Sequence, residues 1–97
     1  VFIGPYDLSG TMGLMGQVHH QDVEAAIGHV FRVAQASGVA PGLLLAAPKP
    51  GEIASRIAEG FQFLAVGLDT LMLVNAAQDL AAQWAHAQSR GATQGDR

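Results

Sequence analysis

The chain has 97 residues and a formal net charge of −3, and it is 49% hydrophobic but only 13% charged. Its five Lys and Arg residues are scattered and form no basic face, which argues against nucleic acid as a partner. There is no run of about 18 apolar residues, so no membrane-spanning helix and no membrane partner are expected. The absence of cysteine excludes disulfides and thiol chemistry in this segment and suits a cytoplasmic enzyme.

The chain opens with an apolar run, Val1 to Ile3, that stops at Gly4-Pro5. Three bulky apolar residues in a row predict a strand buried on both faces, as in a parallel sheet, and the Gly-Pro pair ends it. Asp7 then lies just past the carboxyl end of this strand, where α/β folds place ligands, in what we expect to be a loop rich in Gly and Met. Because the chain begins with Val inside a strand and not with Met, we expect earlier strands to precede it.

An apolar stripe with helical spacing follows the polar segment 17–22. It consists of Val23, Ala26, Ile27, Val30, Phe31 and Ala34. Steps of three and four residues predict a helix, and Asp22 and Glu24 in its first turn suit the helix dipole. Gly38 follows the last turn and can take the left-handed conformation that ends many helices.

Two further apolar runs, 43–47 and 61–67, predict buried strands. Between them, a Pro-Lys-Pro-Gly loop at 48–51 leads into a short helix over 52–59 that ends at Gly60. The order strand, helix, strand, helix, strand, helix predicts right-handed βαβ units and a parallel α/β sheet. Neither of the glycine-rich phosphate-binding motifs occurs, so a nucleotide-binding fold is the weaker choice.

Asp69 follows the third strand as Asp7 follows the first, and we interpret it as a cap for the last helix. That helix is expected over 70–88, with Leu80 and Trp84 on its apolar stripe. The remaining residues, 89–97, are Gly-rich and polar, which predicts a flexible tail after a domain part that spans 1–88. An isolated domain of this size is seldom so apolar, so we expect the rest of a larger fold or another chain to cover part of its surface.

The carboxylate of Asp7 is the leading candidate for chemistry. Carboxylate oxygens are the ligands that hard divalent cations prefer, although an Asp here could equally cap a turn or a short helix. Since Pro5 has no N–H, the first free amides after the strand belong to Tyr6 and Asp7, and they form either an anion-binding nest or a simple turn. His19 and His20 are adjacent and point to different sides, so we favour a solvated helix entry over a shared metal ion.

Three blocks of this sequence resemble segments of the HpcH/HpaI aldolase family. They are Phe-Ile-Gly-Pro-Tyr-Asp-Leu-Ser at 2–9 with Met12-Gly13 after it, Ala-Pro-Gly-Leu-Leu at 40–44, and Phe-Leu-Ala-Val-Gly-Leu-Asp-Thr at 63–70. The likeness extends to about Trp84, and the family consists of metal-dependent, pyruvate-type aldolases built as (β/α)8 barrels. A complete barrel typically needs about 250 residues, so the resemblance implies that this chain holds only the C-terminal three βα units.

The resemblance implies a class II aldolase that cleaves 4-hydroxy-2-oxo acids, such as 2,4-dihydroxyhept-2-ene-1,7-dioate, to pyruvate and an aldehyde. Asp7 would bind Mg²⁺, Mn²⁺ or Co²⁺, which stabilises the enolate. The amides of Tyr6 and Asp7 would bind the substrate carboxylate, and Leu44 would make an apolar substrate contact or serve as barrel core. Tyr6 is larger than the residue common at its position, so it narrows or lines the pocket.

No catalytic residue of the family matches this segment. The resemblance places the second metal ligand, a Glu, and the His base and Arg on earlier strands, so we expect the 97-residue chain alone to be inactive. The alternatives are a citramalyl- or malyl-thioester lyase of the same superfamily, and a non-catalytic half-barrel that assembles with a partner. The resemblance also implies a homo-oligomer that contacts through the last helix, with Leu80 and Trp84 as contacts.

Overall fold

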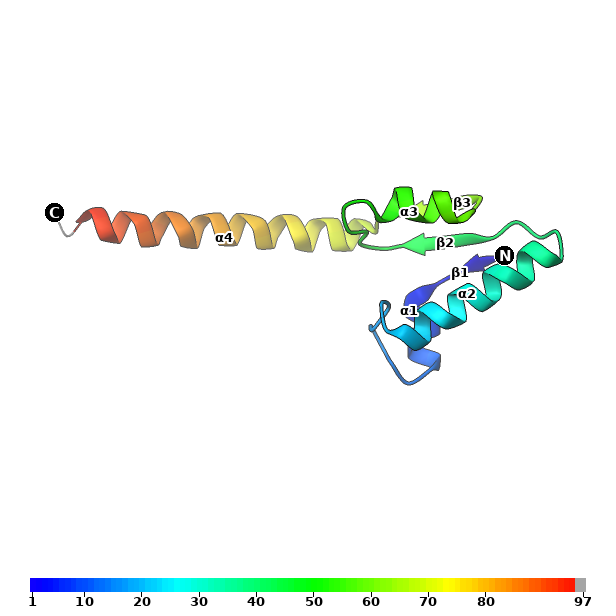
Figure 1. Cartoon of the computed structure of the whole chain (residues 1–97). Coiled ribbons are helices and arrows are strands. Elements are labelled where there is room, and N and C mark those ends of the chain that lie inside the picture. Colours follow the sequence, from blue (N-terminus) through cyan, green and yellow to red (C-terminus); the bar gives the residue numbers. More distant parts are fainter. Residues whose placement is uncertain (96–97) are drawn as a thin grey trace. The chain divides into compact units, whose positions relative to one another are not determined.

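The computed structural model describes residues 1–95 and divides the chain into two units, of which the second begins at Leu68. The first unit contains β1 (Phe2–Ile3), α1 (Pro5–Thr11), α2 (Gln21–Ala36), β2 (Gly42–Leu45), α3 (Glu52–Glu59) and β3 (Phe63–Val66) (Figure 1). The second unit is the single helix α4 (Asp69–Gly95). No helix in the described part of the chain combines the length and the apolar character needed to cross a bilayer.

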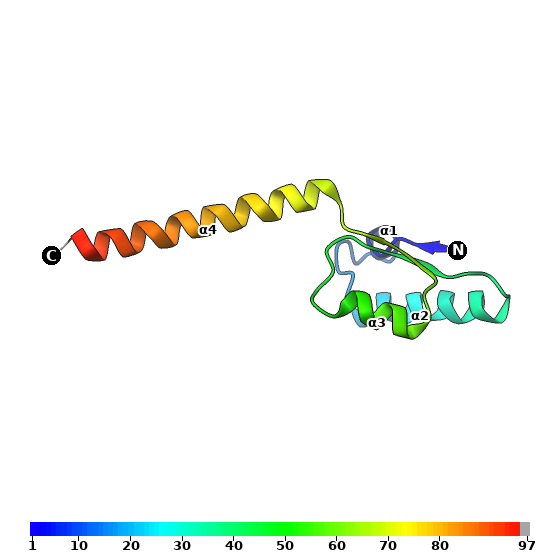
Figure 2. The same cartoon turned by 90° about the horizontal axis from the view of Figure 1, so that it is seen from above.

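The three strands form one parallel sheet in the order β1-β2-β3, which confirms the predicted parallel α/β arrangement. One row across the sheet joins Ile3, Leu43 and Leu64, and the row before it joins Phe2, Gly42 and Phe63. Because successive side chains along a strand point to opposite faces, these two rows lie on opposite faces of the sheet. Helices α2 and α3 lie side by side over the face that carries the row of Ile3, Leu43 and Leu64 (Figure 2).

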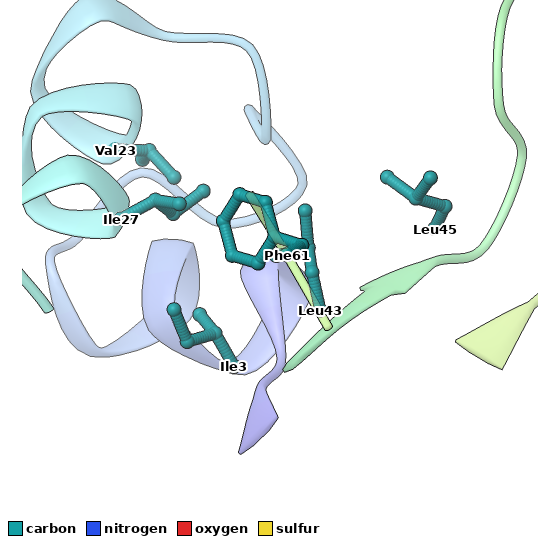
Figure 3. Packing of buried hydrophobic residues seen from close by; sticks show 6 residues of the cluster. All are labelled: Ile3, Val23, Ile27, Leu43, Leu45 and Phe61. Atoms are coloured by element: carbon teal, nitrogen blue, oxygen red, sulfur yellow. The ribbon is translucent and has the colours of Figure 1, made fainter. Parts of the chain in front are cut away.

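The hydrophobic core lies between α2 and the sheet. Val23 and Ile27 from the predicted apolar stripe are fully buried, and they point toward Ile3, Leu43 and Phe61 (Figure 3). Burial of each such side chain contributes about 1.5–3 kcal/mol, so α2 is held to the sheet mainly by this cluster. Helix α3 has no buried residue, so a buried apolar cluster of this kind does not attach it to α2.

The opposite face of the sheet is apolar and half-exposed in this chain. The rings of Phe2 and Phe63 stack with their centroids 5.4 Å apart, across the backbone of Gly42. A Cβ at Gly42 would collide with the Phe63 ring, so glycine is needed for the ring to lie directly on β2. This face matches the expectation that part of the surface requires a cover.

The structure corrects the expectation of a loop directly after the first strand. Residues 5–11 form the helix α1, with Pro5 in its first turn and Gly10 inside it. Pro is well suited to the first helical position because its missing N–H would have no intrahelical partner there. The second and third strands are also shorter than the predicted runs, since β2 ends at Leu45 and β3 begins at Phe63.

The last helix is longer than predicted. It was expected to end near Gln88, but α4 continues to Gly95 and includes Gly91. Glycine in a helix interior costs about 1 kcal/mol relative to alanine, which weakens this turn without ending it. Residues 89–95 of the expected tail are thus helical, and residues 96 and 97 lie outside the described part of the chain.

Candidate functional site

Asp7 lies in the first turn of α1, immediately beyond the carboxyl end of β1. Its carboxylate turns back toward the strand, because Oδ2 lies 3.4 Å from the position that a Cβ would occupy at Gly4. Asp7 is exposed, and none of the described residues hydrogen-bonds to its carboxylate. An accessible carboxylate of this kind fits the oxygen preference of a hard divalent cation.

Two backbone amides beside this carboxylate are available as donors. The first bond of the α1 ladder runs from the Leu8 N–H to the Gly4 carbonyl oxygen, at 3.0 Å. The N–H groups of Tyr6 and Asp7 precede it, so they have no acceptor within the helix. The two amides were expected in a turn, whereas the structure places them at the start of a helix, where the backbone dipoles also favour an anion.

A cavity of about 250 Å³ brings together two of the three residues for which a substrate role was expected. Tyr6 and Leu44 both line it, together with Gly16 and Val18 from the segment that connects α1 to α2. Asp7 is not among its lining residues, although Tyr6 is its neighbour in the chain. The structure therefore gives Tyr6 and Leu44 one shared space and leaves Asp7 at the edge of the sheet beside it.

Charged side chains from α2 and α3 form another wall of this cavity. Arg56 Nη2 lies 2.7 Å from Glu24 Oε1, and Arg56 Nη1 lies 3.1 Å from Glu59 Oε2. Burial lowers the pKa of Arg56, but the hydrogen bonds and charges of Glu24 and Glu59 outweigh the burial and raise the pKa above the ordinary arginine value. Arg56 therefore stays a cation and links the two helices.

The two adjacent histidines have separate surroundings, as their positions in the sequence suggested. His20 caps α2, because its Nδ1 accepts the Asp22 N–H at 3.1 Å. His19 lies between two carboxylates, with its ring nitrogens 3.8 Å from Glu24 Oε1 and 3.7 Å from Glu52 Oε1. Among the side chains that the structure describes, no three His, Asp or Glu residues come together as a potential metal site. A metal ion at Asp7 would therefore need ligands from outside the described chain.

Asp69 accepts a hydrogen bond from the Thr70 N–H, with 2.8 Å between Oδ1 and the nitrogen. The bond satisfies one of the amides at the start of α4, but the Met72 N–H donates to the Leu68 carbonyl oxygen at 2.9 Å, so Leu68 holds the cap position. Asp69 was expected to cap the helix, whereas it bonds this amide as the first residue inside it.

Sequence reasoning missed the ion pairs that Arg56 forms with Glu24 and Glu59, which it treated as ordinary helix positions. Arg56 and Glu24 are 32 residues apart, so no local pattern joins them. One signal was available. Helices that follow neighbouring parallel strands lie side by side, so charged residues on their facing sides come close together, here Glu24 from the first turn of α2 and Arg56 from the last turn of α3.

Comparison with known proteins identifies the family. The chain belongs to the HpcH/HpaI aldolase/citrate lyase family, whose sequence pattern matches residues 1–76. The family expected from the three sequence blocks is therefore confirmed.

The chain is similar to aldolases along most of its length. It is 43% identical over 90 residues to the 4-hydroxy-2-oxo-heptane-1,7-dioate aldolase of Shigella flexneri, covering 92% of this chain and 33% of the relative. It is 39% identical over 84 residues to the hydroxypyruvate/pyruvate aldolase of Roseobacter denitrificans, covering 87% of this chain and 32% of the relative. The chain thus spans about a third of the length of these relatives.

Solved structures of the family match the fold. A family member from Burkholderia cenocepacia superposes with a TM-score of 0.68 at 28% identity, covering 84% of this chain and 31% of that one. The HpcH/HpaI aldolase of Desulfitobacterium hafniense gives a TM-score of 0.66 at 27% identity, with coverage of 84% and 32%. The three parallel strands and their helices therefore correspond to part of the fold of these proteins.

Proposed function

We propose that the protein containing this chain is a divalent-metal-dependent aldolase that cleaves 4-hydroxy-2-oxo acids to pyruvate and an aldehyde. The observation that carries this proposal is the position of Asp7, an accessible carboxylate beside two free amides at the carboxyl end of a parallel strand, in a member of this family. Relatives named as aldolases of 4-hydroxy-2-oxo acids favour this branch over a thioester lyase.

In this proposal the chain supplies the C-terminal three βα units of a (β/α)8 barrel. The half-exposed face with Phe2 and Phe63 then points toward the barrel interior, where side chains from the other strands would cover it. The parallel order of β1, β2 and β3 and the placement of α2 and α3 over one face agree with this arrangement. The Asp7 site then lies at the carboxyl-terminal end of the strands, where barrel enzymes place their active sites.

The residues of this chain have binding and positioning roles in the reaction. Asp7 holds the cation, and a cation bound there supplies Lewis-acid stabilisation of the negative charge that develops on the substrate keto oxygen. The amides of Tyr6 and Asp7 donate to the substrate carboxylate and fix its orientation. Leu44 and the Tyr6 ring, which share the cavity, limit the size of the substrate that fits.

The remaining chemistry requires residues from elsewhere in the protein. In retro-aldol cleavage the substrate hydroxyl loses its proton to a base, the adjacent carbon–carbon bond breaks, and the carbon next to the keto group takes up a proton to give pyruvate. The resemblance places the base of the family on earlier strands, and none of the described residues corresponds to it. We therefore propose that the chain alone is inactive.

An activity assay of the full-length protein tests the proposal. We expect pyruvate release from 4-hydroxy-2-oxo-heptane-1,7-dioate that depends on Mg²⁺ or Mn²⁺ and stops when a chelator is added. Asp7→Asn should lower this activity at least about 100-fold, because the amide is a much weaker ligand than the carboxylate. Asp69→Asn is the matched control, since Asp69 also follows a strand but accepts a helix amide, which asparagine can accept as well. Equal activities for the two variants would refute the role of Asp7.

A homo-oligomer is the proposed assembly. Leu80 and Trp84 lie one turn apart on α4, and both are largely exposed in this chain. Exposed Leu and Trp on one helix face are typical of a surface that another subunit covers.

A further inference from the structure

Ser9 is a polar residue of α1 with no exposed surface. Its hydroxyl donates a hydrogen bond to the Tyr6 carbonyl oxygen at 2.7 Å and accepts one from the Gly16 N–H at 3.1 Å. A buried hydroxyl is costly unless it is hydrogen-bonded, and here the donor and one acceptor site are both used. The same hydroxyl thus connects the first turn of α1 to a backbone amide that lies seven residues after Ser9.

The segment from Met12 to Gly16 is joined to α1 by this connection and by backbone hydrogen bonds. The Leu14 N–H donates to the Ser9 carbonyl oxygen at 2.8 Å, so the backbone of Ser9 also holds the segment. Leu14 packs against the core, whereas Met12 and Met15 are exposed and contribute little burial. The backbone of Gly16 has φ of 79°, a conformation that favours glycine, and its N–H reaches the hydroxyl from there.

Both ends of this connection belong to the candidate site. Tyr6 provides one of the two free amides, and Tyr6 and Gly16 line the same cavity. The Ser9 hydroxyl therefore connects the turn that would bind the substrate carboxylate to a segment that also lines the cavity. Without this hydroxyl, the Gly16 N–H loses its partner, and the backbone bonds at Met12, Gly13 and Leu14 and the packing of Leu14 are left to hold the segment.

We propose that Ser9 is a positioning residue that holds the segment Met12–Gly16 against the start of α1 and thereby fixes the amides that bind the substrate carboxylate. This inference rests on the proposed aldolase function. Because the amides bind the carboxylate throughout the reaction, loss of their alignment weakens the ground state and the transition state alike. It should therefore raise KM and leave kcat nearly unchanged.

The test uses the full-length protein with Ser9→Ala and the matched control Thr11→Ala. The Thr11 hydroxyl also bonds to a carbonyl oxygen of α1, that of Asp7 at 3.1 Å, but it is exposed and does not reach the segment Met12–Gly16. Two readouts are measured, amide hydrogen exchange over residues 12–16 and the steady-state kinetics of pyruvate release. Ser9→Ala should speed the exchange and raise KM by roughly five- to ten-fold each, which corresponds to the loss of one ordinary hydrogen bond. Thr11→Ala should stay near wild type.

Several results would overturn the inference. Unchanged exchange in Ser9→Ala would show that the hydroxyl does not hold the segment, and faster exchange with an unchanged KM would show that the segment does not position the site. A wild-type protein that releases no pyruvate overturns the proposed function and this inference with it. An active wild type with an unaltered Ser9→Ala overturns only the inference. If Ser9→Ala does not fold, Ser9→Cys takes its place, because the thiol has a similar size but forms weaker hydrogen bonds.

Discussion

The link between α2 and α3 gives the most informative stability prediction. Helix α3 has no buried residue, so its attachment depends on Arg56, whose side chain is only 12% exposed. Arg56 bonds to Glu24 on α2 at 2.7 Å and lies with its guanidinium carbon 6.0 Å from the centre of the Phe61 ring. Replacement of Arg56 by Met should therefore free α3 to open locally while the core between α2 and the sheet stays closed.

The magnitude follows from the burial of the two partners. A hydrogen bond between charged groups contributes about 1.5–3 kcal/mol when buried, and an exposed ion pair contributes about 0–1 kcal/mol. Glu24 is 36% exposed, which places this pair between the two cases, and we expect a coupling free energy of about 1–2 kcal/mol. Glu59 is 49% exposed and lies three residues from Arg56 on the same helix, so its coupling should be only about 0.2–0.5 kcal/mol.

Two double-mutant cycles measure these two values. Arg56→Met is combined with Glu24→Gln in one cycle and with Glu59→Gln in a second, matched cycle in the full-length protein. The quantity to measure is the free energy of local opening of α3, from hydrogen exchange of its backbone amides. If the coupling to Glu24 does not exceed the coupling to Glu59, the bond between the helices does not hold α3 and the reasoning is refuted.

Three further predictions follow from the structure. Ile27→Ala should lower the free energy of unfolding by about 2–5 kcal/mol, because Ile27 is only 1% exposed. Val33 lies on the outer side of α2 and is 51% exposed, so Val33→Ala should cost less than about 1 kcal/mol. Unfolding by denaturant compares the two variants. The pKa of Arg56 is raised in the folded protein. The contribution of the Arg56 charge to stability is therefore complete below the ordinary arginine pKa and is lost only as the pH rises through the higher pKa of the folded state. The Arg56 charge should therefore not change the opening of α3 between about pH 6 and 9. Leu80→Ser combined with Trp84→Ser should reduce the oligomeric state, and an unchanged mass by light scattering would exclude α4 as the interface.

The parts of the fold with strong local signals were predicted from the sequence. Helix α3 has the predicted bounds because Gly51 and Gly60 flank it, and both glycines take positive φ. The stripe of α2 was recognised because its spacing reports the face that packs on the sheet, as the burial of Val23 and Ile27 confirms. These features depend on residues that are close together in the sequence, so one sequence is enough to predict them.

The parts that were wrong depend on weaker or longer-range effects. Helix α1 is short and contains Gly10, so its composition indicated a loop, although Pro5 at the first helical position was a valid helix signal. The pair of Arg56 and Glu24 forms only when two helices pack side by side, so the sequence did not display it. For the candidate site, the position of Asp7 after β1 was correct, whereas its metal role and the substrate roles of Tyr6 and Leu44 stay predictions.

The metal role of Asp7 is tested most directly by a crystal structure of the full-length protein soaked with Mn²⁺, with the cation located by its anomalous signal. We expect one Mn²⁺ at about 2.0–2.3 Å from an Asp7 carboxylate oxygen, with a Glu from an earlier strand of a (β/α)8 barrel as a second protein ligand. A cation bound elsewhere, with the Asp7 carboxylate free or engaged only as a helix cap, would show that Asp7 does not bind the metal.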